Sequence, residues 1–150
     1  MNSLQNGEFL ELTIQDLMIS SERVAHVQIG NNLEHALLVL TKSGYTAIPV
    51  LDPDYRLHGL ISTPIIMDSI LGLERIEFEQ LEEKHVEEVM KQNVPRVKIT
   101  ASLLSCIDLL VNHPFLCVET EDGFFGGILP RSTVLSQLSR IVKRFKMTEK

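Results

Sequence analysis

Two hydroxyl side chains stand at the start of a predicted strand that also contains a proline. The stretch GYTAIPVLDPDYRLHGLIS (44–62) predicts a strand, a tight turn and a second strand, because apolar runs flank an Asp-Pro-Asp turn. Tyr45 and Thr46 precede the first run, and Pro49 lies within it, where it cannot donate to a neighbouring strand. Hydroxyls and unpaired backbone groups at a strand end can fix a small ligand. Tyrosine and threonine are also common strand residues, so an ordinary strand edge is the alternative.

The other reactive residue types form no catalytic or metal-binding pattern. The 5 histidines lack metal-ligand spacing, and no Gly-rich phosphate loop is present. Serine, cysteine and histidine residues form no recognisable nucleophile and base set. Arg131 stands where a helix is expected to begin, so it is either a solvated first-turn residue or an anion contact. We therefore expect a binding protein that is not an enzyme and holds no metal.

Composition limits the class of protein further. The chain has 150 residues, which suits one domain or two small halves sharing a core. Its net charge of -6 argues against nucleic-acid binding. Charged residues or histidines interrupt every long apolar run, and MNSLQNGEFLEL does not have the pattern of a signal peptide, so no membrane association is expected. Cys106 and Cys117 fit buried thiols in a reducing compartment, which predicts a cytoplasmic location.

The chain repeats itself at an interval of roughly 70 residues. TIQDLM (13–18) resembles HVEEVM (85–90), and AIPVLDPDYRLHGLIS resembles FLCVETEDGFFGGILP, with Gly59 over Gly127. NNLEHALLVL (31–40) matches ASLLSCIDLL (101–110) with apolar residues at helical spacing in both copies. These residues are Leu33, Ala36, Leu37 and Leu40 in the first copy and Leu103, Cys106, Ile107 and Leu110 in the second.

Each copy therefore predicts a lead-in helix, a short strand, a helix, a strand, a turn, a strand and a helix. Asn31 is the expected N-cap of the first internal helix, and Thr63 with Pro64 is expected to open the helix after the second strand. We place the repeats at residues 1–74 and 75–150. A unit of about 60 residues is marginal alone, so we expect the two copies to pack together.

This order of elements, with its Gly-h-h-Ser/Thr turn into a helix (h, hydrophobic), resembles the CBS domain, and two in tandem resemble a CBS pair, or Bateman module. RVAHVQIGNNLEHALLVLTKSGYTAIPVLDPDYRLHGLI is similar to the first half of small stand-alone CBS-pair proteins of Gram-positive bacteria that bind cyclic di-AMP, the DarB/CbpB type. The resemblance implies an α/β (α+β) fold of two βαββα repeats related by a pseudo-two-fold axis. It also implies a disc-like homodimer.

In CBS pairs the ligand lies in a cleft between the two repeats. Carried onto this chain, the resemblance implies a first cleft formed by Arg23, Val24, Ala25, Tyr45, Thr46, Ala47, Pro49, Arg131, Ser132 and Thr133. The resemblance implies a second cleft formed by Val94, Arg96, Phe115, Leu116, Cys117, Ser62 and Thr63. This cleft would be poorer, because Phe115-Leu116-Cys117 replaces Tyr-Thr-Ala and no arginine stands at Thr63. We therefore expect one occupied site in each chain.

The implied ligand chemistry suits these residue types. Ala25 and Ala47 are small enough for a purine ring to approach the backbone, and Tyr45 can stack on a base. Arg131 and Arg23 can each hold a phosphate, and a cyclic dinucleotide carries two. CBS motifs that bind nucleotides often carry an Asp three residues after the Ser/Thr, where the two copies in this chain have Ile65 and Thr133. That difference is more compatible with cyclic di-AMP than with AMP or ATP.

The resemblance implies a cytoplasmic second-messenger receptor with cyclic di-AMP as ligand and no cofactor. Its ligand-free form would bind a target such as the (p)ppGpp synthetase/hydrolase Rel of the stringent response, or pyruvate carboxylase, and the ligand would release that target. The alternatives are an adenine mononucleotide (AMP/ATP) energy sensor and a protein-interaction scaffold with a vestigial cleft. The acidic run ERIEFEQLEEKHVEE (74–88) predicts either a solvated linker and helix face or a docking surface for a basic partner.

Overall fold

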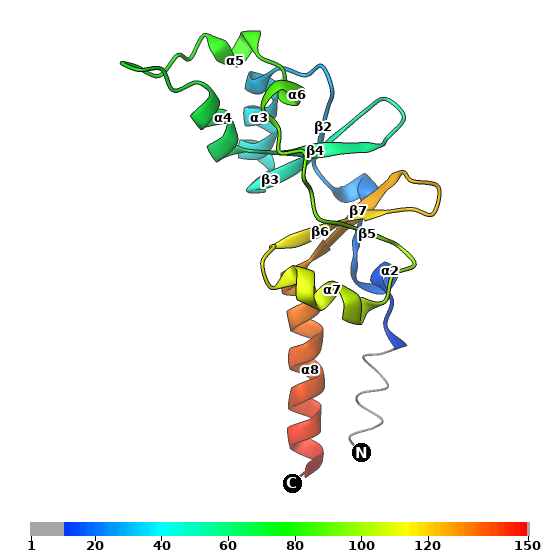
Figure 1. Ribbon diagram of the computed structural model, residues 1–150. Helices are drawn as coiled ribbons and strands as arrows, with labels where there is room; N and C mark the ends of the chain where they lie inside the picture. Colours follow the sequence, from blue (N-terminus) through cyan, green and yellow to red (C-terminus); the bar gives the residue numbers. More distant parts are fainter. Residues whose placement is uncertain (1–10, 150) are drawn as a thin grey trace. The chain divides into compact units, whose positions relative to one another are not determined.

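The chain forms two compact units, shown in Figure 1, a computed structural model that describes residues 11–149. The middle unit comprises Val24–Val94. The terminal unit combines the described N-terminal residues up to Arg23 with those from Pro95 onward. Each unit has its own sheet and its own hydrophobic core, so each is described separately.

The middle unit is built on a three-stranded sheet in the order β2-β3-β4. β2 runs parallel to β3, and β3 runs antiparallel to β4. Two further short helices, α5 and α6, follow the βαββα segment and pack on α3 and on β4, respectively. The bounds are β2 (Val27–Gln28), α3 (Leu33–Ser43), β3 (Ala47–Leu51), β4 (Leu57–Ser62), α4 (Thr63–Ser69), α5 (Gln80–Glu83) and α6 (Val86–Val89).

Helix α3 forms where the apolar spacing predicts it. Its buried residues are Leu33, Ala36 and Leu40, and Leu37 is partly buried against the same core. Gly44 ends the helix with φ 79°, a left-handed conformation that glycine adopts without strain. The core of this unit consists of Val27, Leu33, Ala36, Leu40, Ile48, Val50, Ile61, Ile66, Ile70 and Val86.

The terminal unit has a four-stranded sheet in the order β1-β7-β6-β5. β5 is parallel to β6, whereas β6 and β1 are both antiparallel to β7. The long helix α8 continues directly from β7. The bounds are α2 (Ile14–Leu17), β1 (Ile19–Ser20), the 3-10 helix η1 (Ser21–Arg23), β5 (Arg96–Lys98), α7 (Leu103–Leu110), β6 (Phe115–Glu119), β7 (Phe125–Pro130) and α8 (Arg131–Glu149).

Each lead-in segment joins the sheet of the other repeat. Ile19 pairs with Ile128 of β7, so the first lead-in lies in the terminal unit. Lys91, which follows the second lead-in helix, exchanges backbone hydrogen bonds of 2.9 Å with Leu60 of β4 in the middle unit. Each lead-in contributes a completely buried apolar residue, Ile14 to one core and Val86 to the other.

This exchange explains the two glycines that match between the repeats. A Cβ on Gly59 would stand 2.7 Å from the carbonyl oxygen of Lys91, and a Cβ on Gly127 would stand 2.1 Å from that of Ile19. Both glycines therefore allow the crossing lead-in backbone to approach the sheet. The compact units are a different division from the sequence repeats, and the repeat boundary between residues 74 and 75 stays a prediction.

The structure confirms a mixed α+β fold with the predicted order of elements, and it corrects two helix caps by one residue. Asn32, not Asn31, caps α3 by accepting from the amide of His35 at 2.9 Å. Ser62, not Thr63, caps α4, with Pro64 in the first turn. Asn31 instead accepts from the amide of Gln28 and shapes the preceding turn.

Candidate ligand-binding residues

The middle unit gathers six of the predicted contact residues at one end of its sheet. Val27 pairs with Val50 in parallel register, so the residues that precede β2 lie beside the start of β3. Val24 is buried, whereas Ala25 is partly exposed and packs against the middle core. This arrangement brings Val24 and Ala25 together with the segment that begins at Tyr45.

Tyr45, Thr46 and Ala47 form the connection from α3 to β3. Tyr45 is half-buried and packs against the middle core, which restrains its ring, while Thr46 is exposed. Ala47 is the first residue of β3 and lies opposite Ser62, the residue that caps α4. The first repeat therefore places a restrained aromatic ring, an exposed hydroxyl and a small side chain on consecutive residues.

Pro49 is buried in the central strand of the three-stranded sheet and does not interrupt it. It lies opposite Leu60 in the antiparallel register with β4. The parallel pairing with β2 begins only at Val50, one residue later. The expected gap in pairing is therefore confined to the β2 side, since Pro49 keeps its place in the register with β4.

His26 is a neighbour of the predicted site that sequence reasoning considered only as a metal ligand. Its Nδ1 donates to the carbonyl oxygen of Val24 at 3.1 Å, and its ring packs on the ring of Tyr55 in a T-shaped arrangement with a centroid distance of 5.4 Å. Tyr55 has φ 65°, where the other repeat has Gly123 at φ 88°. His26 thus joins the backbone at Val24 to the β3–β4 turn. In the sequence, His26 directly follows the predicted contact Ala25, and this position could have indicated that it lies beside the predicted site.

The terminal unit holds the other four predicted residues. Arg23 is exposed and ends η1, which packs on β7. Because β1 is antiparallel to β7, the chain approaches the start of β7 as it passes from Ser20 to Arg23. Arg131, Ser132 and Thr133 follow the opposite end of β7, in the first turn of α8. The two arginines therefore lie toward opposite ends of one strand.

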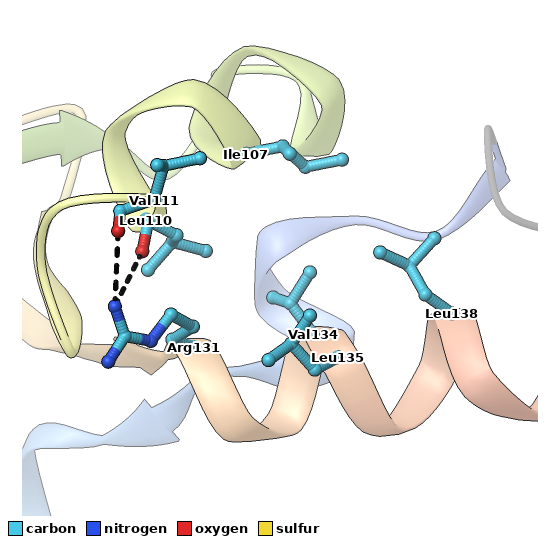
Figure 2. A pocket seen from close by; sticks show the side chains of 7 residues that line it. All are labelled: Ile107, Leu110, Val111, Arg131, Val134, Leu135 and Leu138. Atoms are coloured by element: carbon cyan, nitrogen blue, oxygen red, sulfur yellow. Dashed lines mark hydrogen bonds between the residues drawn. The ribbon is translucent and has the colours of Figure 1, made fainter.

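Arg131 already has protein partners. Its Nη1 donates to the carbonyl oxygens of Leu110 at 3.2 Å and Val111 at 3.3 Å, at the C-terminal end of α7. Figure 2 shows these two bonds from a guanidinium that reaches from α8 to α7. Within residues 11–149 the structure assigns no partner to Nη2 or Nε, so these atoms can still donate to an anion.

The cavity beside Arg131 is not suited to a dinucleotide. It has a volume of about 80 Å³, and Figure 2 shows that aliphatic side chains of α7 and α8 line it. Ligand pockets are usually several hundred Å³ and contain converging polar groups. The lining residues are Ile107, Leu110, Val111, Arg131, Val134, Leu135 and Leu138.

The residues implied for a second cleft have structural partners in the terminal unit. Arg96 of β5 lies beside Cys117 of β6, and its Nη1 is 3.8 Å from an Oε of Glu119. Burial raises the pKa of the Cys117 thiol to about 12, so this side chain stays neutral. Leu116 and Cys117 are completely buried, which fits core packing.

Two other kinds of site find no support in the part of the chain that the structure describes. No group of three or more His, Cys, Asp or Glu side chains there is arranged to hold a metal ion. No helix among residues 11–149 is sufficiently long and apolar to cross a membrane.

Comparison with known proteins decides the family. The profile of the CBS domain matches residues 14–72. Cyclic di-AMP receptor B of Bacillus subtilis (strain 168) is 54% identical over 143 residues, which span 95% of this chain and 97% of the receptor. This chain belongs to the CBS-domain family.

Solved CBS structures agree with the whole fold. A CBS domain-containing protein from Bacillus anthracis is 61% identical, covers 90% of this chain and 98% of its own, and superposes with a TM-score of 0.85. CbpB from Listeria monocytogenes in complex with cyclic di-AMP is 55% identical, with a TM-score of 0.81 over 87% of this chain and 97% of its own. The chain is therefore a tandem CBS protein of the same type as these relatives.

Proposed function

We propose that this CBS protein is a cytoplasmic cyclic di-AMP receptor and not an enzyme, and that it binds the dinucleotide in a cleft between its two repeats. One observation carries the proposal: 54% identity over nearly the full length of both chains with Cyclic di-AMP receptor B of Bacillus subtilis. The aligned segment extends over both repeats, so every residue predicted to contact the ligand lies within it.

The middle unit supplies the chemistry for a purine base. Ala25 and Ala47 present little side-chain bulk, so a flat ring can approach the backbone beside β3. Tyr45 offers a face for stacking, and packing against the core reduces the entropy lost when the base binds. The exposed hydroxyl of Thr46 can donate to or accept from the base edge.

The terminal unit supplies the chemistry for phosphate. Arg131 is anchored through Nη1, so Nη2 and Nε are held in a defined orientation while remaining able to bind an oxyanion. Arg131, Ser132 and Thr133 also occupy the first turn of the 19-residue helix α8, where backbone N–H groups favour negative charge. Arg23, toward the other end of β7, would hold the second phosphate.

Regulation of a protein target completes the proposal. In this hypothesis the ligand-free form binds a target such as Rel or pyruvate carboxylase, and cyclic di-AMP releases it. If cyclic di-AMP lowers the affinity for the target by a given factor, linkage requires that the target lowers the affinity for cyclic di-AMP by the same factor. A titration of cyclic di-AMP with and without saturating Rel tests this, and equal affinities in both would refute the competition. The homodimer expected of CBS pairs belongs to the same proposal.

Tyr45 provides a sharp test of the proposed cleft. Tyr45→Ala should weaken cyclic di-AMP binding by roughly 5- to 150-fold, because loss of stacking costs about 1–3 kcal/mol. Tyr45→Phe keeps the ring and is the matched control, with affinity expected to stay close to the wild type. Calorimetric titration gives both dissociation constants, and an unchanged affinity in Tyr45→Ala would place the base elsewhere.

A further inference from the structure

Residues 71–78, between α4 and α5 of the middle unit, form a closed turn that we call the finger. Leu71 and Ile76 pair as an antiparallel bridge, and the amide of Gly72 donates to the carbonyl oxygen of Arg75 at 2.8 Å. The amide of Glu77 donates to Ile70 at 2.7 Å, so backbone bonds close the base of the turn. In Figure 1 the green connection between α4 and α5 extends away from the helices of its own unit.

The finger exposes large apolar side chains at a fixed position. Leu73 at its tip is fully exposed (106%), and Leu71 and Phe78 are 58% and 59% exposed. Single exposed leucines are common on protein surfaces, but here three large apolar side chains are exposed within residues 71–78 of one hydrogen-bonded turn, and we call Leu71, Leu73 and Phe78 the apolar patch. Neither Leu73 nor Phe78 belongs to the hydrophobic core of this unit.

The charge around this patch has one sign. Residues 71–83 contain five glutamates and a single arginine. Arg75 donates to both carboxylate oxygens of Glu79, which lowers the pKa of Glu79 to about 2 and neutralises the arginine. The remaining glutamates give the patch a negative rim, which repels anionic lipid surfaces and nucleic acids. A partner that fits must combine apolar side chains with positive charge.

We propose that the finger, together with the acidic face of α5, docks a basic amphipathic segment of a partner protein. Leu73 and Phe78 insert among the apolar side chains of that segment, while Glu74 and Glu82 face its lysines or arginines. The proposal deepens the proposed function by naming the surface that the regulated target uses, and it rests on that function only for this role. None of the residues predicted to contact the ligand lies in the finger.

The test uses the full-length protein and a defined probe. The probe is a fluorescent 18-residue helical peptide of lysine and leucine, with leucines at i, i+3, i+4 and i+7 spacing. Its control has the same composition in an order without an apolar face. Fluorescence anisotropy should show binding of the amphipathic peptide at least tenfold tighter than binding of the control, with weaker affinity at higher salt.

Variants then locate the site. The double variant Leu73→Ser/Phe78→Ser should lose at least tenfold in affinity, and Glu74→Gln/Glu82→Gln should reduce the salt dependence. The matched control is Leu104→Ser, which removes a leucine that is 52% exposed on α7 in the other unit and should bind as the wild type does. Equal binding by all variants would overturn the proposal, because general negative charge would then explain the interaction.

Two further measurements separate the other outcomes. If sedimentation velocity shows that Leu73→Ser/Phe78→Ser forms a smaller assembly than the wild type, the finger is a contact between copies and the proposal fails. Cyclic di-AMP titration of the same variants should match the wild type. If the wild type did not bind cyclic di-AMP, the proposed function would be refuted, while the peptide assay would still decide whether the finger docks a basic segment. Failure of the receptor proposal and failure of the docking proposal are therefore distinguishable.

Discussion

Arg131 combines a structural task with the phosphate contact we propose for it. Arg131→Ala should lower the free energy of unfolding by about 1–3 kcal/mol, because two hydrogen bonds to the end of α7 are lost. It should also weaken cyclic di-AMP binding by tenfold or more, because a charged phosphate partner disappears. Arg131→Lys should cause smaller losses of stability and affinity than Arg131→Ala but should not match the wild type, because a single ammonium nitrogen cannot reproduce the separate Nη1 and Nη2 positions of a guanidinium. Urea unfolding and calorimetry measure the two effects separately.

The control for Arg131 lies on the same helix. Arg140 is exposed on α8 and is not among the predicted ligand contacts, so Arg140→Ala should leave both quantities near the wild type. If Arg131→Ala lost stability but bound cyclic di-AMP normally, the arginine would serve only to join α8 to α7.

At the scale of elements, the β3–β4 turn is held by a carboxylate that accepts three hydrogen bonds. The Asp52 carboxylate accepts from the amides of Arg56 at 3.0 Å and Asp54 at 2.9 Å, and from His58 Nε2 at 2.8 Å. These bonds, led by the one from Arg56, hold the pKa of Asp52 below its ordinary value of 3.8. The other repeat has Thr120 at this position, which accepts from Phe124 through a hydroxyl that does not titrate.

A pKa lowered by folding means that the charged form of Asp52 stabilises the protein above pH 4. That stabilisation is lost as the pH falls below 4 through the folded-state value. Asp52→Asn keeps an acceptor oxygen but loses the charge, so it should be less stable than the wild type at pH 6, and this difference should narrow as the pH falls from 4 to 2.5. Urea midpoints across this range test the prediction, with Asp122→Asn in the other turn as control. A gap of constant size would contradict it.

Local sequence patterns predicted the order of helices and strands, but they misplaced the N-caps of α3 and α4 by one residue. The apolar spacing of α3 and the Asp52 turn are set by residues close together in sequence, so both were predictable. The start of α3 also depends on distant backbone, because the amide of Leu33 donates to the carbonyl oxygen of Lys84 at 2.9 Å. Asn31 and Asn32 are equivalent as caps in sequence, and this long-range bond favours Asn32.

At the scale of the whole molecule, the exchange of lead-in segments was not predictable from the repeat. The repeat shows that TIQDLM and HVEEVM are equivalent, but not which sheet each one joins. The site shows the same limit. Tyr45, Thr46 and Ala47 were proposed as ligand contacts from the strand pattern and the family resemblance. The contacts of His26 with Tyr55 and of Arg131 with α7 depend on tertiary structure, so the sequence did not predict them.

The exchange predicts which fragment of the chain is more stable. A fragment of residues 24–94 retains Val86 and the pairing of Lys91 with Leu60, whereas a fragment of residues 1–74 lacks both. The 24–94 fragment should therefore show a cooperative urea transition by circular dichroism, and the 1–74 fragment should not. Equal stability of the two fragments would mean that the lead-in contributes little to the middle core.

The central claim is that this CBS protein binds cyclic di-AMP selectively. Calorimetric titration of the full-length protein with cyclic di-AMP, cyclic di-GMP, AMP and ATP tests it most directly. We predict binding of cyclic di-AMP at one site per chain and much weaker binding of the other three. Binding of AMP or ATP without a cyclic di-AMP signal, or no signal from any of the four, would contradict the claim.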